Sequence, residues 1–252
     1  MIVTTNLTKA YGATVVVNGV SLTLPRGGVT SIIGPNGAGK STLLSLISRL
    51  VDATSGSVTV DGLDVANTRG DILARHLSIL RQDNQIATRL TVRDLVAFGR
   101  YPYSKGRLTT DDHKVINSAI GYLGLDELAD RFIDEMSGGQ RQRAFVAMVL
   151  CQDTDYVLLD EPLNNLDVKH AIAMMKLVRR IADELGKTFV LVLHDINFAS
   201  IYSDHIIAMR DGAVMHQGGP AEIVCAEVLR EVFDIDIAIH DIEGHRLGLF
   251  YL

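Results

Sequence analysis

The sequence has few of the residues that mark extracellular or membrane-spanning proteins. It contains two cysteines, Cys151 and Cys225, and no tryptophan. Their distance in the sequence fits neither a disulfide framework nor a metal-binding spacing, so we expect a reduced, cytosolic chain. The N-terminus has no basic segment followed by an apolar one, which predicts no signal peptide. Apolar runs such as 189–193 are far shorter than the ~20 residues that cross a bilayer, so we expect no membrane span.

An excess of basic residues is also missing. The chain has 24 Lys and Arg against 30 Asp and Glu, a formal net charge of −6, which argues against a general nucleic-acid surface. The acidic excess is concentrated in residues 221–252, where seven acidic side chains face only Arg230 and Arg246. With 252 residues, 47% of them hydrophobic, the chain can bury a sizeable core in one large or two small domains.

The hydrophobic pattern predicts an α/β protein. Short β-branched runs alternate with helical patterns, which favours a mostly parallel sheet covered by helices. The expected strands span 15–17, 20–24, 29–33, 56–60, 77–80, 156–159 and 188–193, with a hairpin at 205–209 and 213–217. The expected helices span 41–50, 91–98, 110–123, 126–131, 138–150 and 168–185.

Two segments have a pattern of their own. Residues 83–155 contain helical patterns and no clear strand, which indicates a helical segment inserted into the α/β core. Within it we expect a loop at Tyr101, Pro102 and Gly106, and Thr110 as the cap of the next helix. Residues 221–252 predict one or two helices followed by two short strands around Glu243 and Gly244.

A glycine-rich loop predicts phosphate binding. It lies between an apolar strand and an apolar helix, which is the context that such a loop requires. Its glycines let backbone N–H groups converge on phosphate oxygens, the lysine reaches the β- and γ-phosphates, and the serine ligates Mg²⁺. The alternative is a glycine-rich turn with an exposed lysine. The loop comprises Gly34, Pro35, Asn36, Gly37, Ala38, Gly39, Lys40, Ser41 and Thr42.

A second motif places two carboxylates at the end of an apolar strand. The run 156–159 is followed by Asp160, Glu161 and Pro162. The carboxyl end of a parallel strand is where ligands bind in α/β sheets. We expect Asp160 to hold hydrated Mg²⁺ and Glu161 to polarise an attacking water. By itself, the motif could equally be a strand followed by an acidic turn.

A third motif, Ser137-Gly138-Gly139-Gln140, opens a predicted helix and offers a hydroxyl and free N–H groups to an anion. The plainer interpretation is a serine N-cap followed by flexible glycines. Two phosphate sites about a hundred residues apart suggest a two-fold dimer. In that dimer each phosphate loop would face the partner's Ser-Gly-Gly segment, with ATP buried between two chains.

Three single residues complete the candidate site. Gln82 follows a predicted strand and could reach metal or water, although a lone glutamine is usually a surface residue. His194 follows the strand that ends at Leu193, a position that favours a γ-phosphate contact over a structural histidine. Tyr11 could stack on adenine, and an exposed tyrosine is the alternative.

Taken together, these motifs resemble those of ABC-type ATPase domains over essentially the whole chain. Tyr11 matches the aromatic that stacks on adenine, the loop from Gly34 the Walker A motif, and Gln82 the Q-loop. The signature, Walker B and switch-histidine positions are matched by 136–140, 156–161 and His194, and the D-loop by Asn165-Leu166-Asp167, so that Asp167 joins the ATP-binding set. Met136 stands where leucine is usual, and Asn164-Asn165 where Ser-Ala is more usual.

This resemblance implies a P-loop NTPase (RecA-like) core with a mostly parallel sheet, an N-terminal antiparallel β part and an inserted helical subdomain. The implied nucleotide-binding core is 1–82 with 156–220. The helical signature subdomain is 83–155 and the C-terminal extension is 221–252. The implied activity is hydrolysis of ATP with Mg²⁺, with Lys40, Gln82, Glu161 and His194 as the catalytic group and Ser41, Gln82 and Asp160 at the metal.

A finer resemblance is to the ATPase subunits of importers for ferric siderophores, haem and cobalamin. It rests on 99–103, on 162–167 and on a tail, 234–251, similar to the siderophore branch. The implied function is to power import of a metal chelate, a ferric siderophore first, by ATP-driven closure of a homodimer on a transmembrane permease. The implied place is the cytoplasmic side of the cell (inner) membrane, peripheral, with an extracytoplasmic substrate-binding protein as an indirect partner.

We further expect the residues just after Gln82 and the loop 99–107 to lie at the surface where the permease docks. The alternatives are an importer ATPase for haem or cobalamin, a soluble ABC ATPase acting on nucleic acid or ribosomes, and an exporter ATPase. The acidic charge and the absence of long heptad arms or a second ATPase half in 252 residues argue against the soluble class, so no nucleic-acid partner is expected.

Overall fold

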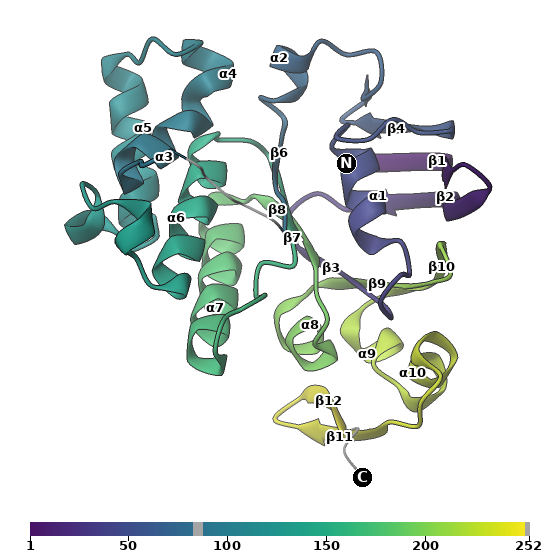
Figure 1. The fold of residues 1–252 in the computed structure, drawn as a ribbon. Helices are drawn as coiled ribbons and strands as arrows, with labels where there is room; N and C mark the ends of the chain where they lie inside the picture. The colour runs from purple at the N-terminus through teal and green to yellow at the C-terminus, as the bar shows by residue number, and fades with distance from the viewer. Residues whose placement is uncertain (83–87, 250–252) are drawn as a thin grey trace.

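The computed structural model describes residues 1–82 and 88–249 (Figure 1). Its centre is a six-stranded sheet in the order β10-β9-β3-β8-β7-β6, in which all neighbours are parallel except β9 and β10. These strands are β3 (Gly28–Ile33), β6 (Leu77–Leu80), β7 (Tyr156–Asp160), β8 (Thr188–Val192), β9 (His205–Arg210) and β10 (Ala213–Gly218). The mostly parallel sheet expected from the sequence is confirmed.

A smaller antiparallel sheet lies beside it, at the upper right in Figure 1, in the order β2-β1-β4-β5. The strands are β1 (Ile2–Tyr11), β2 (Thr14–Leu24), β4 (Ser55–Val60) and β5 (Leu63–Asp64). The two strands expected at 15–17 and 20–24 are one strand, β2, because Gly19 adopts φ 59° and lets the backbone continue through a local irregularity. Strand β1 was not expected from the sequence, because its polar and apolar residues do not alternate strictly.

The six-stranded sheet is buried on both faces because its strands alternate between two cores. In β3, Val29 and Ile33 pack into the core shared with the helices, whereas Ile32 packs into the core shared with the antiparallel sheet. Helix α1 (Lys40–Ile47) belongs to that second core. Helices α7 (Val168–Leu185) and α8 (Ile196–Tyr202) cover the other face. The phosphate loop therefore lies between a fully buried strand and a buried helix.

The segment between β6 and β7 is helical, as expected, at the upper left in Figure 1. Its helices are α3 (Val92–Ala97), α4 (Tyr101–Ser104), α5 (Thr110–Tyr122) and α6 (Gly138–Cys151), with 3₁₀ turns η1 (Phe98–Arg100), η2 (Asp126–Leu128) and η3 (Ile133–Glu135). Among the described residues its one bridge joins Thr91 to Phe132. The boundaries of the core and of this segment as separate domains stay a prediction.

Three details of this segment differ from the expectations. The loop expected at Tyr101 begins as helix α4, because a proline is compatible with the first turn of a helix. The cap of α5 is Thr109, whose hydroxyl accepts from the N–H of Asp112; Thr110 is the first helical residue. The helix expected over 126–131 is the 3₁₀ turn Asp126–Leu128 alone.

In this segment the position of Arg100 differs most from the expectation, which placed the loop 99–107 at a docking surface. Only 8% of the residue is exposed, and its Nε donates to Asp112 Oδ1 at 2.8 Å. The guanidinium also lies over the ring of Tyr103, at 4.0 Å from the centroid, and donates to the carbonyl of Cys151. Arg100 therefore fastens α4 and α5 to the end of α6. It does not form part of an exposed docking surface, although Phe98 and Tyr101 nearby are 55% and 63% exposed.

The C-terminal part consists of two short helices and a hairpin, as the sequence predicted. Helices α9 (Pro220–Ile223) and α10 (Ala226–Phe233) are followed by β11 (Ala238–Ile242) and β12 (His245–Leu249). The hairpin lies against α8, where the amide of Asn197 bonds both the N–H and the carbonyl of Gly248. Helix α2 (Gly70–Leu73) stands apart, between β5 and β6. In the part of the chain that the structure describes, no helix combines the length and apolarity needed to span a membrane.

Candidate functional site

The backbone of the phosphate loop is held by contacts that only glycine permits. Gly34 has φ 148°, and a Cβ there would stand 2.1 Å from the carbonyl oxygen of Met209. Gly39 has φ 93°, and a Cβ there would stand 2.5 Å from the carbonyl oxygen of Val16. A Cβ on Gly37, by contrast, would meet no atom within 4 Å. The loop is thus locked on its inner side against β9 and β2 and open on its outer side, where phosphate would approach.

Lys40 is drawn back into this loop. The residue is only 5% exposed, and its Nζ donates to the carbonyl oxygens of Gly34 and Pro35, both at 2.9 Å. Burial lowers the pKa of Lys40, and the nearby carboxylates of Glu161 and Asp160 oppose that shift. A phosphate group would supply a full negative charge in place of two carbonyl dipoles, so the ammonium group has a clear reason to change partners when nucleotide binds.

Ser41 and Asp160 form an oxygen pair that fits Mg²⁺. The Ser41 hydroxyl, at the start of α1, donates to Asp160 Oδ1, at the end of β7, over 2.8 Å. Burial raises the pKa of Asp160, and the Ser41 hydrogen bond opposes that shift. Hydroxyl and carboxylate oxygens are the ligands that Mg²⁺ prefers, and a cation would relieve the cost of burying this carboxylate. Asn36 and Gly37 are exposed at the outer side of the loop, Ala38 is buried and Thr42 is half-buried.

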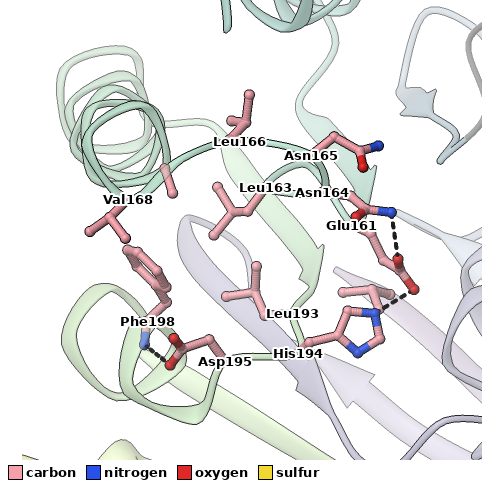
Figure 2. Close-up of a pocket in the computed structure, with 12 residues that line it drawn as sticks. Glu161, Leu163, Asn164, Asn165, Leu166, Val168, Leu193, His194, Asp195 and Phe198 are labelled. Atoms are coloured by element: carbon pink, nitrogen blue, oxygen red, sulfur yellow. Dashed lines mark hydrogen bonds and ion pairs between the residues drawn. The ribbon is translucent and has the colours of Figure 1, made fainter. Parts of the chain in front are cut away.

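Glu161 is the most constrained carboxylate of the site. It has φ 50°, a left-handed conformation that a non-glycine residue adopts only under constraint. Its Oε1 lies 2.7 Å from Nε2 of His194, and its Oε2 accepts from Gln82 Nε2 at 2.7 Å. The amide of Asn164 adds a longer hydrogen bond to Oε2, at 3.5 Å (Figure 2). Glu161 is therefore in direct contact with both Gln82 and His194, although the sequence predicted the three residues separately.

A mostly apolar hollow of about 270 Å³ lies next to Glu161 and His194. Figure 2 shows that Leu163 and Phe198 approach it from opposite sides, one from the loop after β7 and the other from α8. Val168, at its rim, is 73% exposed. The glutamate and histidine therefore stand between the phosphate loop and an exposed apolar surface of the same chain.

The Ser137–Gln140 segment lies elsewhere. Ser137 and Gln140 form a reciprocal capping box at the start of α6, which is the plainer of the two interpretations offered by the sequence. A Cβ on Gly139 would stand 2.6 Å from the ring of His170, so the segment packs closely against α7. Among the residues that the structure describes, no hydrogen bond joins this segment to the phosphate loop. The backbone of Gly138 is free of side-chain cover on its outer side.

Two further predicted residues also stand apart from the Lys40 group. Asp167 caps α7, accepting from the backbone N–H and the ring Nδ1 of His170, and these hydrogen bonds lower the pKa of its carboxyl group. Tyr11 is 53% exposed at the end of β1, with Lys9 Nζ 4.9 Å from its ring centroid. Tyr11 pairs with Thr14 of β2, the strand that contacts the phosphate loop through Val16.

Comparisons with known proteins identify the family. Residues 17–164 match the ABC transporter family. The chain is 51% identical to the petrobactin import ATP-binding protein YclP of Bacillus subtilis over 251 residues, 100% of each chain. It is 41% identical to the ferric enterobactin transport ATP-binding protein FepC of Escherichia coli, over 93% of this chain and 88% of that one. The chain belongs to the ABC transporter family.

A solved ATP-binding cassette of this family, MJ0796, has the same fold. The two chains superpose with a TM-score of 0.77 at 30% identity, over 87% of this chain and 99% of that one. That cassette was solved as a dimer in a post-hydrolysis state with ADP and Pi. The P-loop NTPase fold expected from the sequence is thereby confirmed, with its parallel sheet, antiparallel N-terminal sheet and helical part.

Two residues of this ABC protein were not assigned a role from the sequence. Asn164, noted only as a departure from the usual family residue, places its amide on Glu161. His170 lies against Gly139 and Asp167 at once and so links α6 to α7. Both residues lie in the stretch 162–170, next to predicted site residues, and this position was the signal that could have indicated a role. The direction of each side chain, however, depends on the tertiary structure. The expectation for the residues just after Gln82 falls on 83–87, outside the described residues.

Proposed function

We propose that this ABC protein is the ATP-hydrolysing subunit of an importer for a ferric siderophore. The observation that carries ATP hydrolysis is the cluster at the end of β7, where Glu161 contacts Gln82 and His194 beside the Ser41–Asp160 pair. Full-length 51% identity to a petrobactin import protein supports the class of cargo. Haem and cobalamin importers are the competing assignments that an uptake experiment must separate.

The residues of this site divide the work of ATP hydrolysis among them. Lys40 and the backbone N–H groups of the loop bind the β- and γ-phosphates, and Tyr11 stacks on the base. Ser41, Asp160 and Gln82 hold Mg²⁺, which neutralises phosphate charge when bound. The amide nitrogen of Gln82 donates to Glu161, which leaves the amide oxygen of Gln82 available as the metal ligand.

Glu161 is the general base in this proposal. Its Oε2 accepts hydrogen bonds from Gln82 and Asn164, and its Oε1 lies 2.7 Å from His194 Nε2. In this proposal an attacking water takes the place of His194 at Oε1. His194 then becomes free to reach the γ-phosphate.

The second phosphate site requires a second chain. Ser137 begins α6 with free backbone N–H groups, yet no hydrogen bond of the described residues joins it to the phosphate loop of its own chain. We infer a homodimer in which Ser137, Gly138, Gly139 and Gln140 of one chain contact the γ-phosphate held by the other, with Asp167 nearby. The dimeric MJ0796 cassette supports this arrangement.

A permease would dock at the end of the molecule formed by α2 and α4. A hollow of about 270 Å³ lies there between Ala74 and Tyr101, with Lys105 at its edge. It adjoins β6, whose end leads to Gln82, so a change at the nucleotide can reach it. This contact would place the protein peripherally on the cytoplasmic face of the membrane, with an extracytoplasmic binding protein as an indirect partner.

The test is a paired measurement on a variant carrying Tyr101→Ala and Lys105→Ala, coexpressed with the permease. ATP hydrolysis by the isolated subunit should stay within about threefold of the parent, a barrier change below about 1 kcal/mol. Copurification with the permease and uptake of iron-labelled siderophore should fall together. Ile242→Ala, at a 52% exposed position on the C-terminal hairpin, is the matched control and should change neither.

Two results would overturn the proposal at different levels. Uptake of haem or cobalamin in place of ferric siderophore would reject the cargo and leave the ATPase standing. Collapse of ATP hydrolysis in the Tyr101 and Lys105 variant, with assembly intact, would place this surface in the catalytic site instead.

A further inference from the structure

A charged hollow lies away from the nucleotide site, between the C-terminal end of α5 and helices α6 and α7. Its volume is about 440 Å³, within the range of small-molecule sites. Three cations line it: Arg143 from α6, and Lys176 and Arg180 from α7. The remaining lining residues are uncharged, and we call this site the cationic hollow.

None of the three cations is in an ion pair within the part of the chain that the structure describes. The contrast with Arg179, their neighbour on α7, is direct, because Arg179 pairs with both Asp183 and Asp204. The carboxylate of Asp126 lies beside Gly121 at the rim and bonds none of the three. In a chain of net charge −6, such a group of unneutralised cations creates a local positive potential.

The two arginines are held in place by the end of α5. Arg143 Nη1 donates to the carbonyl of Leu123 at 3.1 Å, and Arg180 Nη2 donates to the carbonyl of Tyr122 at 2.9 Å. Each guanidinium has five N–H donors, so both keep donors for a ligand. Capping of α5 by itself explains these two contacts. It does not explain Lys176, which lines the same hollow and has no ion pair or hydrogen bond among the described residues. Nor does it explain the open space that all three residues border.

Two glycines keep the hollow open. Gly121 and Gly124 line the α5 end of it and present no side chain. Gly124 has φ 60°, and a Cβ there would stand 3.6 Å from Arg143 Nη1. The positive φ disfavours a side chain at this position, and even a Cβ would be in contact with the guanidinium. The backbone thus leaves the arginine heads accessible from the solvent side.

We propose that the cationic hollow binds a soluble small molecule that carries one or more phosphate groups. Two guanidinium forks and one ammonium group match the charge and the planar oxygen geometry of phosphate. The volume exceeds what a bare phosphate needs, so the ligand carries a further polar part. A lipid headgroup is the other source of phosphate. No lining residue is among the exposed large hydrophobic side chains, and anchoring in a bilayer needs apolar contact as well as charge.

The position of the site implies that a bound ligand would affect the motion of the helical segment. The hollow joins α5 and α6 of the helical segment to α7, which begins at Asp167. A bound polyanion would bridge elements on both sides of this junction. It would therefore resist relative motion of the segment that carries Ser137, independently of what the importer transports.

The experiment is a calorimetric titration of pyrophosphate into the full chain saturated with Mg²⁺-ADP, which fills the phosphate loop. We expect one further site, weakened about tenfold or more in a variant carrying Lys176→Ala and Arg180→Ala, because charge-assisted hydrogen bonds are lost. A variant carrying Lys114→Ala and Arg230→Ala removes the same charge from exposed positions elsewhere and should bind as the parent does. Raising the salt concentration should weaken the further site.

Two results would overturn the proposal. The first is no binding tighter than about 1 mM to the ADP-saturated chain, or binding that the Lys176 and Arg180 substitutions leave unchanged. The second is sedimentation of the chain with phosphatidylglycerol vesicles, lost in the same variant, together with no pyrophosphate binding. Circular dichroism of both double variants verifies that each is folded.

Discussion

Lys40 and Ser137 both stand at the start of a helix that can bind phosphate, but their surroundings differ. Lys40 is 5% exposed, within hydrogen-bonding distance of two carbonyls, and next to the Ser41–Asp160 pair. The N–H and the hydroxyl of Ser137 bond to Gln140 in a capping box, and its carbonyl accepts from the N–H of Arg141 in the same helix. The first half-site has its proposed metal ligands, its proposed base and its cation in one chain. The second has only the end of a helix.

The backbone shows the same difference. Gly34 and Gly39 are enclosed by Met209 and Val16, so the phosphate loop cannot change without moving β9 or β2. Gly138 has nothing nearer to a Cβ than the carbonyl of Asn165, at 4.0 Å. A half-site locked into a core is preorganised, whereas one at an exposed helix start obtains its geometry from whatever docks on it. The following predictions test this division, from the largest expected effect to the smallest.

Glu161→Gln should lower ATP hydrolysis about 10²–10⁴-fold, the usual contribution of a general base, and leave ATP binding intact. The amide keeps the shape of the side chain and one acceptor oxygen for Gln82 and Asn164, but it cannot take a proton from water. Steady-state hydrolysis and equilibrium titration measure the two quantities. Glu231→Gln, on α10 and paired with His216, is the control and should change neither. Undiminished hydrolysis would remove Glu161 from the base role.

Ser137→Arg, in the Glu161→Gln background, should abolish the dimer that ATP induces, because a long cation fills the place meant for the partner's γ-phosphate. Light scattering with and without ATP measures the dimer. Ser137→Ala removes the helix cap, at a cost of about 1 kcal/mol in stability, and the hydroxyl contact, but it adds no bulk and should still dimerise through the remaining N–H groups. An ATP-induced dimer in the arginine variant would show that the signature segment lies outside the nucleotide interface.

Lys40→Ala should weaken ATP binding by about 1.5–3 kcal/mol, the contribution of a hydrogen bond to a charged group. This is about a tenfold to 150-fold rise in Kd, measured by titration calorimetry. Lys114→Ala, which removes a lysine that is 72% exposed, is the control. If both variants bound ATP as the parent does, the buried half-site would not be the nucleotide site.

Thr109→Ala should lower the free energy of unfolding by about 1 kcal/mol, since it removes the cap of α5, and leave ATP affinity unchanged. Thr110→Ala, at the position that the sequence suggested as the cap, should cost less than about 0.5 kcal/mol. Chemical denaturation measures both. The reverse order of the two effects would contradict the observed cap.

The same helix start predicts an acid dependence. The backbone N–H of Thr109, followed by Arg100, lowers the pKa of Asp112 to about 2, from 3.8 in an unfolded chain. A lowered carboxyl pKa stabilises the folded state fully above about pH 4, and this stabilisation is lost as the pH falls towards 2. The loss should be smaller in Thr109→Ala, because one of the hydrogen bonds to Asp112 is gone.

Local pattern was enough to predict much of the fold. The bounds of β6 and α7 agree with those expected, because Leu77–Leu80 is a short apolar run and Val168–Leu185 has an uninterrupted helical period that ends at Gly186. β1 was missed because its apolar residues do not alternate and Asn6 interrupts it at φ 47°. β1 is a strand because it pairs with β2 and with β4, and β4 lies far away in the sequence.

The candidate site divides in the same manner. The spacing of the phosphate loop and of Asp160 and Glu161 was readable because the chemistry needs particular residue types at consecutive positions. The direct contact of Glu161 with Gln82 and His194 could not be read from the sequence, since it joins the ends of three strands. Arg100 was expected on the surface because a charged residue in a Gly-Arg-Tyr-Pro stretch is normally solvated. Its burial depends on Asp112 and Tyr103.

The sequence by itself determined most of the strands and helices, the motifs that predict phosphate binding, and the family to which the chain belongs, since these depend on neighbouring residues. The tertiary structure decided that Lys40 is enclosed and Ser137 exposed, that Arg100 is internal, and that Arg143, Lys176 and Arg180 meet around one hollow. The physical reason is that burial and charge pairing depend on distances in space, and residues distant along the chain set those distances only when the sheet and its helices have packed.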